Sequence, residues 1–374
     1  MKKMLSIVGS LSLLATLGAC SSSSSSDTGT GTGNTADAGM GDTGDSGMAI
    51  PSGDPSSIAI PAITVDAVYV VNGGDSSISV VDPAKSAVIG TIKLQNVGYP
   101  HHVYLSPDRS MLAVADPGMD LSGGHHGGME GMKGAILVLD AKTGATMASR
   151  RLDEMNHNGA FSPDGSEIWT TAMTMRGKVL VLDAMTLKTK STIDVGDMPA
   201  EVTFAKDGKH AFVANGTSND VTVIDVATKK AVKTVAVDQD PVGAWPGANG
   251  VMYVDCKTAK TVKAIDSTTF AVTRTYKLGY TPGMARTPPV GDALWVTDSD
   301  SGEVVFNMTT ADMAMGKAAT GAGAHGLSFS DDGKLGFVTN QTGGTLTIIN
   351  VSTQKVLGSV PVGAKPNGLV FRAH

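Results

Sequence analysis

The chain has 374 residues, with 29 lysines and arginines against 35 aspartates and glutamates, and its formal net charge is −6. No stretch concentrates basic residues with interleaved aromatic residues, so we expect no nucleic-acid partner. The cysteines are Cys20 and Cys256, and no internal disulfide can form if the first of them is modified.

The first 19 residues have the pattern of a secretory signal. Two lysines precede an apolar run, Leu5 to Leu17, that is too short to span a membrane. The four residues 17–20, Leu-Gly-Ala-Cys, resemble a bacterial lipobox, which implies lipidation at Cys20 and, from the following Ser21, sorting to the outer membrane. An ordinary signal with an incidental cysteine is the alternative. We expect a cell-envelope protein held by its lipid anchor alone, since no later segment is long and apolar enough to span a membrane.

Residues 20–61 consist mainly of Ser, Gly, Thr and Asp. This composition cannot bury enough apolar surface to offset the entropy lost on ordering. We therefore expect a disordered tether with a reach of roughly 35 Å, followed by one folded domain over residues 62–374.

The folded domain repeats a pattern of four short strands. The pattern is clearest at residues 198–238, where runs rich in Val, Ile, Phe and Thr are separated by turn signals containing Gly, Asn and Asp. The marker residue at the end of the third strand recurs every 41–43 residues after a first interval of 58, at Asp82, Asp140, Asp183, Asp225, Asp266, Asn307 and Asn350. This period predicts an all-β fold, a seven-bladed β-propeller with four-stranded antiparallel blades.

The two ends of the domain complement each other. The first repeat lacks an innermost strand, whereas Lys365–Phe371 has the pattern of an innermost strand with no blade after it. We expect this C-terminal strand to complete the first blade and close the ring, which removes exposed sheet edges. We also expect the closed ring to be a monomer.

Several second strands share a recognisable motif. VYVVN (68–72), AFVAN (211–215) and GFVTN (336–340) are followed by third strands such as VTVID or LTIIN. Over about residues 62–374 the chain resembles the YVTN-type seven-bladed propellers, and the resemblance implies a bacterial periplasmic or surface protein. Similar rings carry metal or haem sites in some respiratory enzymes. The resemblance indicates the fold better than the function.

One register of the second strand is aromatic in six blades and is Ala113 in the seventh. We interpret these residues as the core between blades: Tyr69, Trp169, Phe212, Tyr253, Trp295 and Phe337. Cys256 lies at the end of a second strand, and we expect a buried, unreactive thiol there.

Blade two carries an insertion of about 14 residues between its second and third strands. Its sequence, PGMDLSGGHHGGMEGMKG, contains His125, His126, Met119, Met129 and Met132. Because adjacent strands alternate in direction, this loop should lie at the end of the ring where the first strands begin.

The first strands bring more histidines to that end. Aligning them places His101, His157 and His325 at one register, where the C-terminal strand has Asn367. The next register has His102, Asn158 and Glu201, and first strands line the channel of a propeller. We therefore expect these residues to surround the channel mouth.

Two interpretations of the histidines follow. They are either hydrogen-bonded residues beside a flexible glycine-rich loop, or ligands of a metal. Imidazole with thioether favours copper and imidazole with carboxylate suits zinc. Because a wide channel should keep the first-strand histidines apart, we expect a metal site to need the loop folded inwards. The candidate ligands are His101, His102, His125, His126, His157, His325, Met119, Met129 and Met132.

The sequence thus predicts a tethered module that binds a protein or small molecule at its channel mouth. A copper- or zinc-binding propeller with a redox or metal-handling role is the alternative. A propeller hydrolase or lactonase is the third, with Asp153, Glu154, Glu201 and Arg286 as candidate groups, although no spacing distinguishes them from surface charges.

Overall fold

The computed structural model of the protein describes residues 52–122 and 131–374. The signal segment, Cys20, most of the predicted tether and the insertion residues His125, His126 and Met129 lie outside these ranges. Within them, no helix has the length and apolar character needed to cross a membrane.

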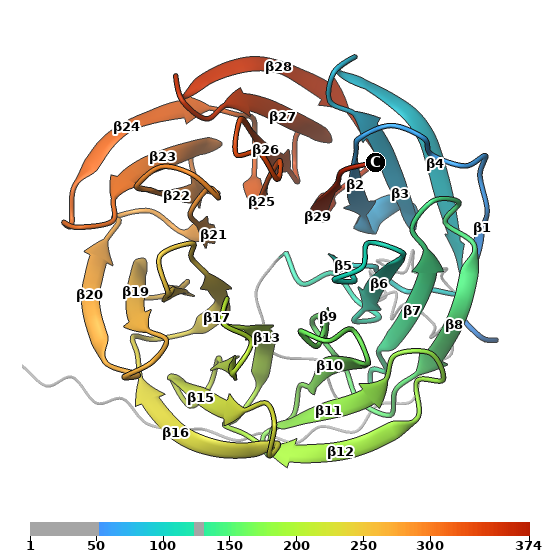
Figure 1. Cartoon of the computed structure of the whole chain (residues 1–374), viewed down its shortest axis with the longest axis horizontal. Helices are drawn as coiled ribbons and strands as arrows, with labels where there is room; N and C mark the ends of the chain where they lie inside the picture. The colour runs from blue at the N-terminus through green and yellow to red at the C-terminus, as the bar shows by residue number, and fades with distance from the viewer. Residues whose placement is uncertain (1–51, 123–130) are drawn as a thin grey trace, which may run out of the picture. The chain divides into compact units, whose positions relative to one another are not determined.

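The described residues form seven antiparallel sheets arranged as a ring (Figure 1). Each blade is a meander that runs from the channel to the outer edge. Blade one contains β2 (Ala67–Asn72), β3 (Ser77–Asp82) and β4 (Ala87–Gln95), with the 3₁₀ turn η1 (Gly73–Asp75) between the first two. Blades two and three are β5 (His102–Leu105), β6 (Met111–Asp116), β7 (Ala135–Asp140) and β8 (Thr146–Arg151), then β9 (Gly159–Phe161), β10 (Glu167–Ala172), β11 (Lys178–Asp183) and β12 (Thr189–Asp194).

The remaining blades repeat this order. Blades four and five are β13 (Pro199–Phe204), β14 (His210–Asn215), β15 (Asp220–Asp225) and β16 (Lys230–Ala236), then β17 (Pro241–Pro246), β18 (Val251–Cys256), β19 (Thr261–Asp266) and β20 (Val272–Lys277). Blades six and seven are β21 (Pro282–Arg286), β22 (Ala293–Asp298), β23 (Glu303–Met308) and β24 (Ala314–Ala319), then β25 (Ala324–Phe329), β26 (Leu335–Asn340), β27 (Thr345–Asn350) and β28 (Lys355–Pro361).

The last strand, β29 (Pro366–Arg372), closes the ring as predicted. It pairs with β2 in blade one and becomes the innermost strand of that sheet. The other edge of the same sheet gains a short fifth strand, β1 (Ser56–Ile58), paired with β4. Ser57 also bonds to blade two, its N–H to Thr146 Oγ1 at 2.8 Å and its hydroxyl to the Gly144 carbonyl at 2.6 Å. The end of the predicted tether is therefore part of the first blade.

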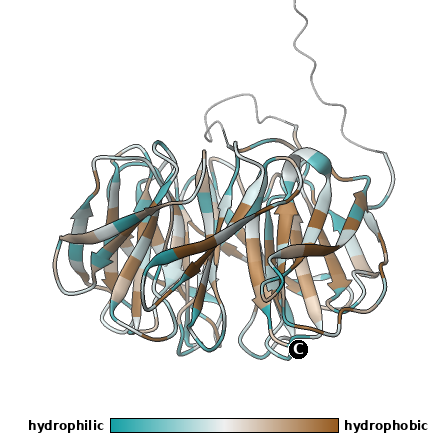
Figure 2. Ribbon diagram, turned by 90° about the horizontal axis from the view of Figure 1, so that it is seen from above, coloured by the Kyte–Doolittle hydropathy of each residue, from teal (hydrophilic) through white to brown (hydrophobic). Residues whose placement is uncertain are grey.

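The core lies between the blades, as the aromatic register predicted. The six aromatic side chains of the second strands are each at most 1 % exposed, and Trp295 packs edge to face on Phe306. Figure 2 shows the hydrophobic residues along the strands and the hydrophilic residues in the loops. Cys256 is buried, and burial raises the pKa of its thiol to about 12, so the expectation of a buried thiol is confirmed.

The marker residues at the ends of the third strands shape the turns that follow. Asp225 Oδ1, for example, accepts hydrogen bonds from the Thr228 N–H at 2.8 Å and the Thr228 hydroxyl at 2.7 Å. In blade six, however, the residue in this register is Met308, and Asn307 lies one place earlier. Since successive residues of a strand face opposite sides, Asn307 is buried, and its Nδ2 donates to backbone carbonyls. The predicted marker was one residue out of register there.

Candidate functional site

Five of the seven inner strands share an irregularity where they enter the channel. In β13, Pro199 pairs with Asn215 and Val202 with Val213, so that Ala200 and Glu201 together face one partner residue. Register shifts occur at the same place in β17, β21, β25 and β29. Such bulges redirect side chains. The residue pairs at this position in the seven blades are His101–His102, His157–Asn158, Ala200–Glu201, Val242–Gly243, Gly283–Met284, His325–Gly326 and Asn367–Gly368.

Threonines of the neighbouring second strands hold these bulges in place. The Thr171 hydroxyl donates to the Ala200 carbonyl at 2.9 Å and the Thr339 hydroxyl to the Asn367 carbonyl at 2.8 Å. The Thr297 hydroxyl donates in the same way to His325 at 2.7 Å. Each bond joins one blade to the next, so the channel wall is fixed by contacts between blades.

Three histidines from two adjacent blades meet in the channel. His101, His102 and His157 each offer a ring nitrogen, and the three nitrogens lie within 4.8 Å of one another. The ring centroids of His101 and His157 are 4.6 Å apart, and those of His102 and His157 are 5.1 Å apart. All three side chains are buried. The expectation that the channel keeps its histidines apart unless the insertion folds inwards is wrong, because His101 and His102 both lie opposite Ala115 of β6 and bring their rings to the same point.

Glu201 orients two of these rings. Its Oε1 lies 2.9 Å from His102 Nε2 and 3.1 Å from His157 Nδ1, and its Oε2 accepts a 2.9 Å hydrogen bond from the Tyr104 hydroxyl. Burial alone would raise the pKa of Glu201, but His102 and His157 outweigh burial through charge and hydrogen bonding and hold this pKa well below its usual range. Glu201 is therefore a fully buried carboxylate anion.

Asn158 and Asn367 act as positioning residues. Asn158 makes two bonds with the Val202 backbone, donating to its carbonyl at 2.7 Å and accepting from its N–H at 3.1 Å, which fixes the strand that carries Glu201. Asn367 Nδ2 lies 2.6 Å from His101 Nδ1.

Gly368 allows the close packing of the histidine pair. Its N–H donates to the His101 carbonyl at 2.8 Å. A Cβ at this position would lie 2.7 Å from His102 Nδ1, a distance that side chains do not tolerate. The glycine is therefore needed for the histidine group to form.

His325 lies beside the group, with its ring centroid 6.2 Å from that of His101. Burial, together with the charges of His102, Lys257 and His157, lowers the pKa of His325 to about 3. Burial also lowers the pKa of His157, although Glu201 acts in the opposite direction. His157 and His325 are thus neutral near pH 7, and neutral imidazole is the form that coordinates metals.

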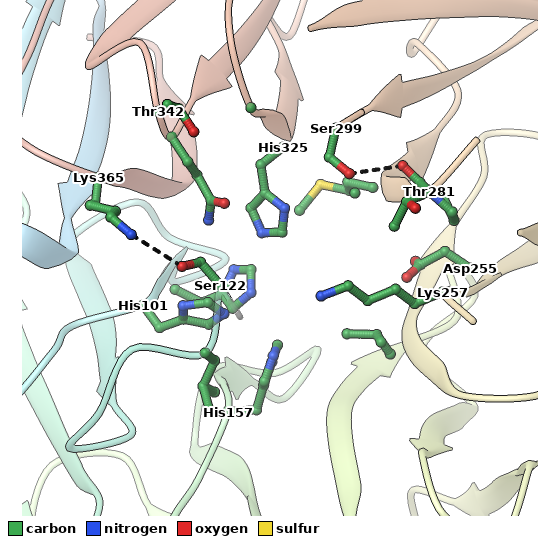
Figure 3. Close-up of a pocket in the computed structure, with 18 of the residues that line it drawn as sticks. His101, Ser122, His157, Asp255, Lys257, Thr281, Ser299, His325, Thr342 and Lys365 are labelled. Carbon is green, nitrogen blue, oxygen red and sulfur yellow. Dashed lines mark hydrogen bonds between the residues drawn. The ribbon is translucent and has the colours of Figure 1, made fainter. Parts of the chain in front are cut away.

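The histidines open into a cavity of about 360 Å³ at one end of the channel. Figure 3 shows His101, His157 and His325 directed into this cavity, with Lys257 extending towards them from the opposite wall. Lys365, which lines this cavity, contacts the segment that follows β6 of blade two. Its Nζ lies 3.1 Å from Asp120 Oδ2 and 3.4 Å from Ser122 Oγ. A site of this kind suits a small polar ligand.

Asp255 is a buried acid in the same cavity. Its Oδ1 accepts a hydrogen bond from Trp245 Nε1 at 2.5 Å, and its Oδ2 accepts one from the Gly243 N–H at 3.3 Å. Burial raises the pKa of Asp255 to about 8, against the opposing effect of the Trp245 bond. Asp255 is thus largely protonated at neutral pH.

The methionines of the insertion that the structure describes lie in an apolar cluster. Met119 and Met132 pack against Leu121, Met155 and Met173. The histidine group consequently offers nitrogen ligands, backed by a carboxylate, and these suit zinc and copper(II) alike.

The candidate enzyme residues are dispersed. Asp153 and Glu154 are exposed in the segment before β9, and Arg286 lines a different cavity. Of this set, Glu201 alone belongs to the histidine group.

Sequence reasoning missed three groups of the site: Tyr104, Asp255 and Lys257. The repeat alignment did contain a signal for Asp255. The penultimate residue of the second strand is small or apolar in the other blades, Val71, Ala115, Thr171, Ala214, Thr297 and Thr339, so an acid at this register stands out. Tyr104 follows His102 by two residues and so faces the same side of the strand.

Comparisons with known proteins support the fold. No family model matches the chain, and none of the curated proteins matches it. Among solved structures, Pseudomonas aeruginosa periplasmic gluconolactonase PpgL is similar, with a TM-score of 0.65 and 16 % identity over 83 % of this chain and 99 % of that one. Kuenenia stuttgartiensis hydrazine synthase has a TM-score of 0.60 and 17 % identity, over 74 % of this chain and 90 % of that one. Dihydro-heme d1 dehydrogenase NirN in complex with DHE has a TM-score of 0.59 and 14 % identity, over 84 % of this chain and 79 % of that one. At these identities the likeness shows the propeller fold and nothing finer.

Proposed function

We propose that this seven-bladed propeller is a lipid-anchored, extracytoplasmic binding protein of the YVTN type whose channel holds a zinc or copper(II) ion. The observation that carries the proposal is the group of three buried imidazoles, His101, His102 and His157, with nitrogens within 4.8 Å of one another. The ion would in turn provide the coordination position for a small-molecule or protein ligand that enters from the 360 Å³ cavity.

The surroundings of the three rings support metal binding. Metal-ligating histidines usually hold their other ring nitrogen in a hydrogen bond to a carboxylate or carbonyl. Here Glu201 bonds both His102 and His157, and Asn367 contacts His101. Bonds of about 2.0–2.1 Å to zinc place tetrahedral ligands roughly 3.4 Å apart, so a triangle of nitrogens 4.8 Å on a side would close with movements of about 0.8 Å per nitrogen.

The test is zinc and copper(II) titration of the chelator-treated full chain by calorimetry. We expect a dissociation constant tighter than about 1 μM, or about −8 kcal/mol. His157→Ala should weaken binding at least about 100-fold by removing a ligand, and Glu201→Gln by about 10- to 100-fold by disturbing two ligands. His210→Ala is the matched control, because His210 lies at the start of β14, outside the histidine group, and packs against Phe270 of blade five.

The insertion histidines provide a second comparison. If the three channel histidines suffice, His125→Ala with His126→Ala should retain tight binding. A parent protein that binds neither ion more tightly than about 1 μM and shows no metal-dependent rise in melting temperature would leave a metal-free binding module as the better account.

A lactone hydrolase is a second candidate, favoured by Asp255. A carboxyl group with a pKa of about 8 in the same cavity as the histidines suits a general acid. One of the similar structures is named as a gluconolactonase. Zinc-loaded protein should then hydrolyse glucono-1,5-lactone, and Asp255→Asn should reduce the rate at least about 100-fold. No hydrolysis above the spontaneous rate would eliminate this candidate.

A further inference from the structure

The channel contains a second cavity, of about 270 Å³, at its other end. The first cavity is lined by residues from the start of the inner strands, whereas this one is lined by later residues such as Leu105, Phe161, Phe204 and Arg286. His102, Trp245 and Met284 border both and separate them. We call the second space the aromatic cavity, because Tyr104, Phe161, Phe204 and Trp245 form much of its wall.

Arg286 brings a positive charge to this apolar wall. Its Nη1 donates to the Leu327 carbonyl at 3.2 Å, and its Nε is enclosed where no ligand can reach it. Its Nη2 has no hydrogen-bond partner among the residues that the structure describes. A guanidinium remains charged in proteins, so a carboxylate in this cavity would bind Arg286 through its Nη groups.

The nearest carboxylate of the channel does not meet this requirement. Glu201 is engaged by His102, His157 and the Tyr104 hydroxyl. The Tyr104 hydroxyl is thus directed to Glu201, while its ring faces the aromatic cavity. Within the described part of the chain, Arg286 forms no ion pair with a carboxylate. A carboxylate partner for its Nη2 would therefore have to come from a ligand.

We propose that the aromatic cavity binds a small carboxylate with a flat apolar body, the carboxylate on Arg286 and the body between the aromatic rings. Arginine presents a planar fork that matches a carboxylate, and aromatic rings stack on flat apolar groups. The volume lies near the lower end of the range for ligand pockets, which selects a ligand of about the size of benzoate. This site is separate from the metal site and does not depend on it.

Benzoate is the probe, titrated into the full chain and followed by calorimetry and by tryptophan fluorescence, because Trp245 lines the cavity. Benzamide has the same shape without the charge, and acetate has the charge without the ring. We expect benzoate to saturate the protein below about 1 mM, and each of the other two compounds to bind at least about 10-fold more weakly. Benzamide lacks the hydrogen bond to a charged group, which contributes about 1.5–3 kcal/mol, and acetate lacks the ring that would stack in the cavity.

Arg286→Gln should weaken benzoate binding by about 10- to 100-fold, and Arg286→Lys should fall between this variant and the parent. Arg150→Gln is the matched control, since Arg150 bonds Leu187 and Thr189 on the outer part of the ring. Melting temperatures near the parent value would verify that the variants fold. Zinc affinity of Arg286→Gln should not fall, which separates this site from the metal site.

Three outcomes would overturn the proposal. The first is no saturation of the folded parent by 10 mM benzoate, and the second is equal affinity for benzoate and benzamide. The third is unchanged benzoate affinity in a correctly folded Arg286→Gln protein.

Discussion

At the scale of single residues, the chemistry of the channel depends on one repeated position, the pair of residues where each inner strand enters the channel. Three blades fill this position with small or apolar residues or an amide and a fourth has His325–Gly326, whereas His101–His102, His157–Asn158 and Ala200–Glu201 come from three consecutive blades. One side of the ring therefore carries three histidines and their carboxylate. The other side contributes Lys257 and the acid Asp255.

Asp255 should make the stability of the protein depend on pH. Its folded-state pKa of about 8 lies above its usual value of 3.8, so the folded state holds a proton that the unfolded state has lost. The stabilising contribution is complete below about pH 4 and is lost as pH rises to about 8, and it amounts to at most on the order of 5 kcal/mol.

Asp255→Asn removes this dependence, because an amide cannot ionise. The free energy of unfolding of the variant minus that of the parent should increase steadily from about pH 4 to about pH 8 and stay constant above it. Chemical denaturation of metal-free protein across this range measures the difference. A difference that does not change with pH would contradict the assignment.

The sequence predicted which residues line the channel but not how close they come. The repeat alignment placed His101, His157 and His325 at one register, and the structure has them in one cavity. The distances could not be predicted, because the alignment treats each blade as contributing one residue at this level. Where an inner strand is bulged, two adjacent residues share this level, and this local change of backbone has no distinct signature in residue types.

At the scale of strands, β29 has two roles: it closes the ring and it contributes residues to the site. It pairs with β2, stacks Phe371 on Phe337 of blade seven, and brings Asn367 and Gly368 against His101 and His102. The sequence revealed this strand because an unpaired inner-strand pattern remained at the C-terminus. It did not reveal β1, since three residues, Ser-Ser-Ile, are too few to show an alternating pattern.

Deletion of residues 364–374 should lower the melting temperature of the whole ring by at least about 10 °C, because the missing inner strand leaves the edge of β2 unpaired and exposes the core beside it. Differential scanning calorimetry checks this. Deletion of residues 52–58 is the matched control, since it removes the outermost strand of the same sheet and little of the core. Equal melting temperatures of the 364–374 deletion and the parent would show that closure does not stabilise the ring.

At the scale of the whole molecule, the proposed lipid anchor at Cys20 would decide where the propeller works. If Cys20 carries lipid, the full chain expressed in a bacterium should enter the detergent phase on phase separation, and Cys20→Ser should move it to the aqueous phase or leave it unprocessed. Cys256→Ser is the control, since that thiol is buried in the ring. Parent and Cys20→Ser proteins that both stay in the aqueous phase would remove the lipid anchor from the proposal.

The closure of the ring also sets the order in which the site can be built. A ribosome makes His101, His102, His157 and Glu201 early, but Asn367 and Gly368 belong to the last strand. Until that strand is released, His101 lacks its amide contact and blade one lacks its inner edge. The histidine group is therefore completed only after β29 has been made, and a chain terminated before residue 366 would carry every histidine of the group without its final geometry.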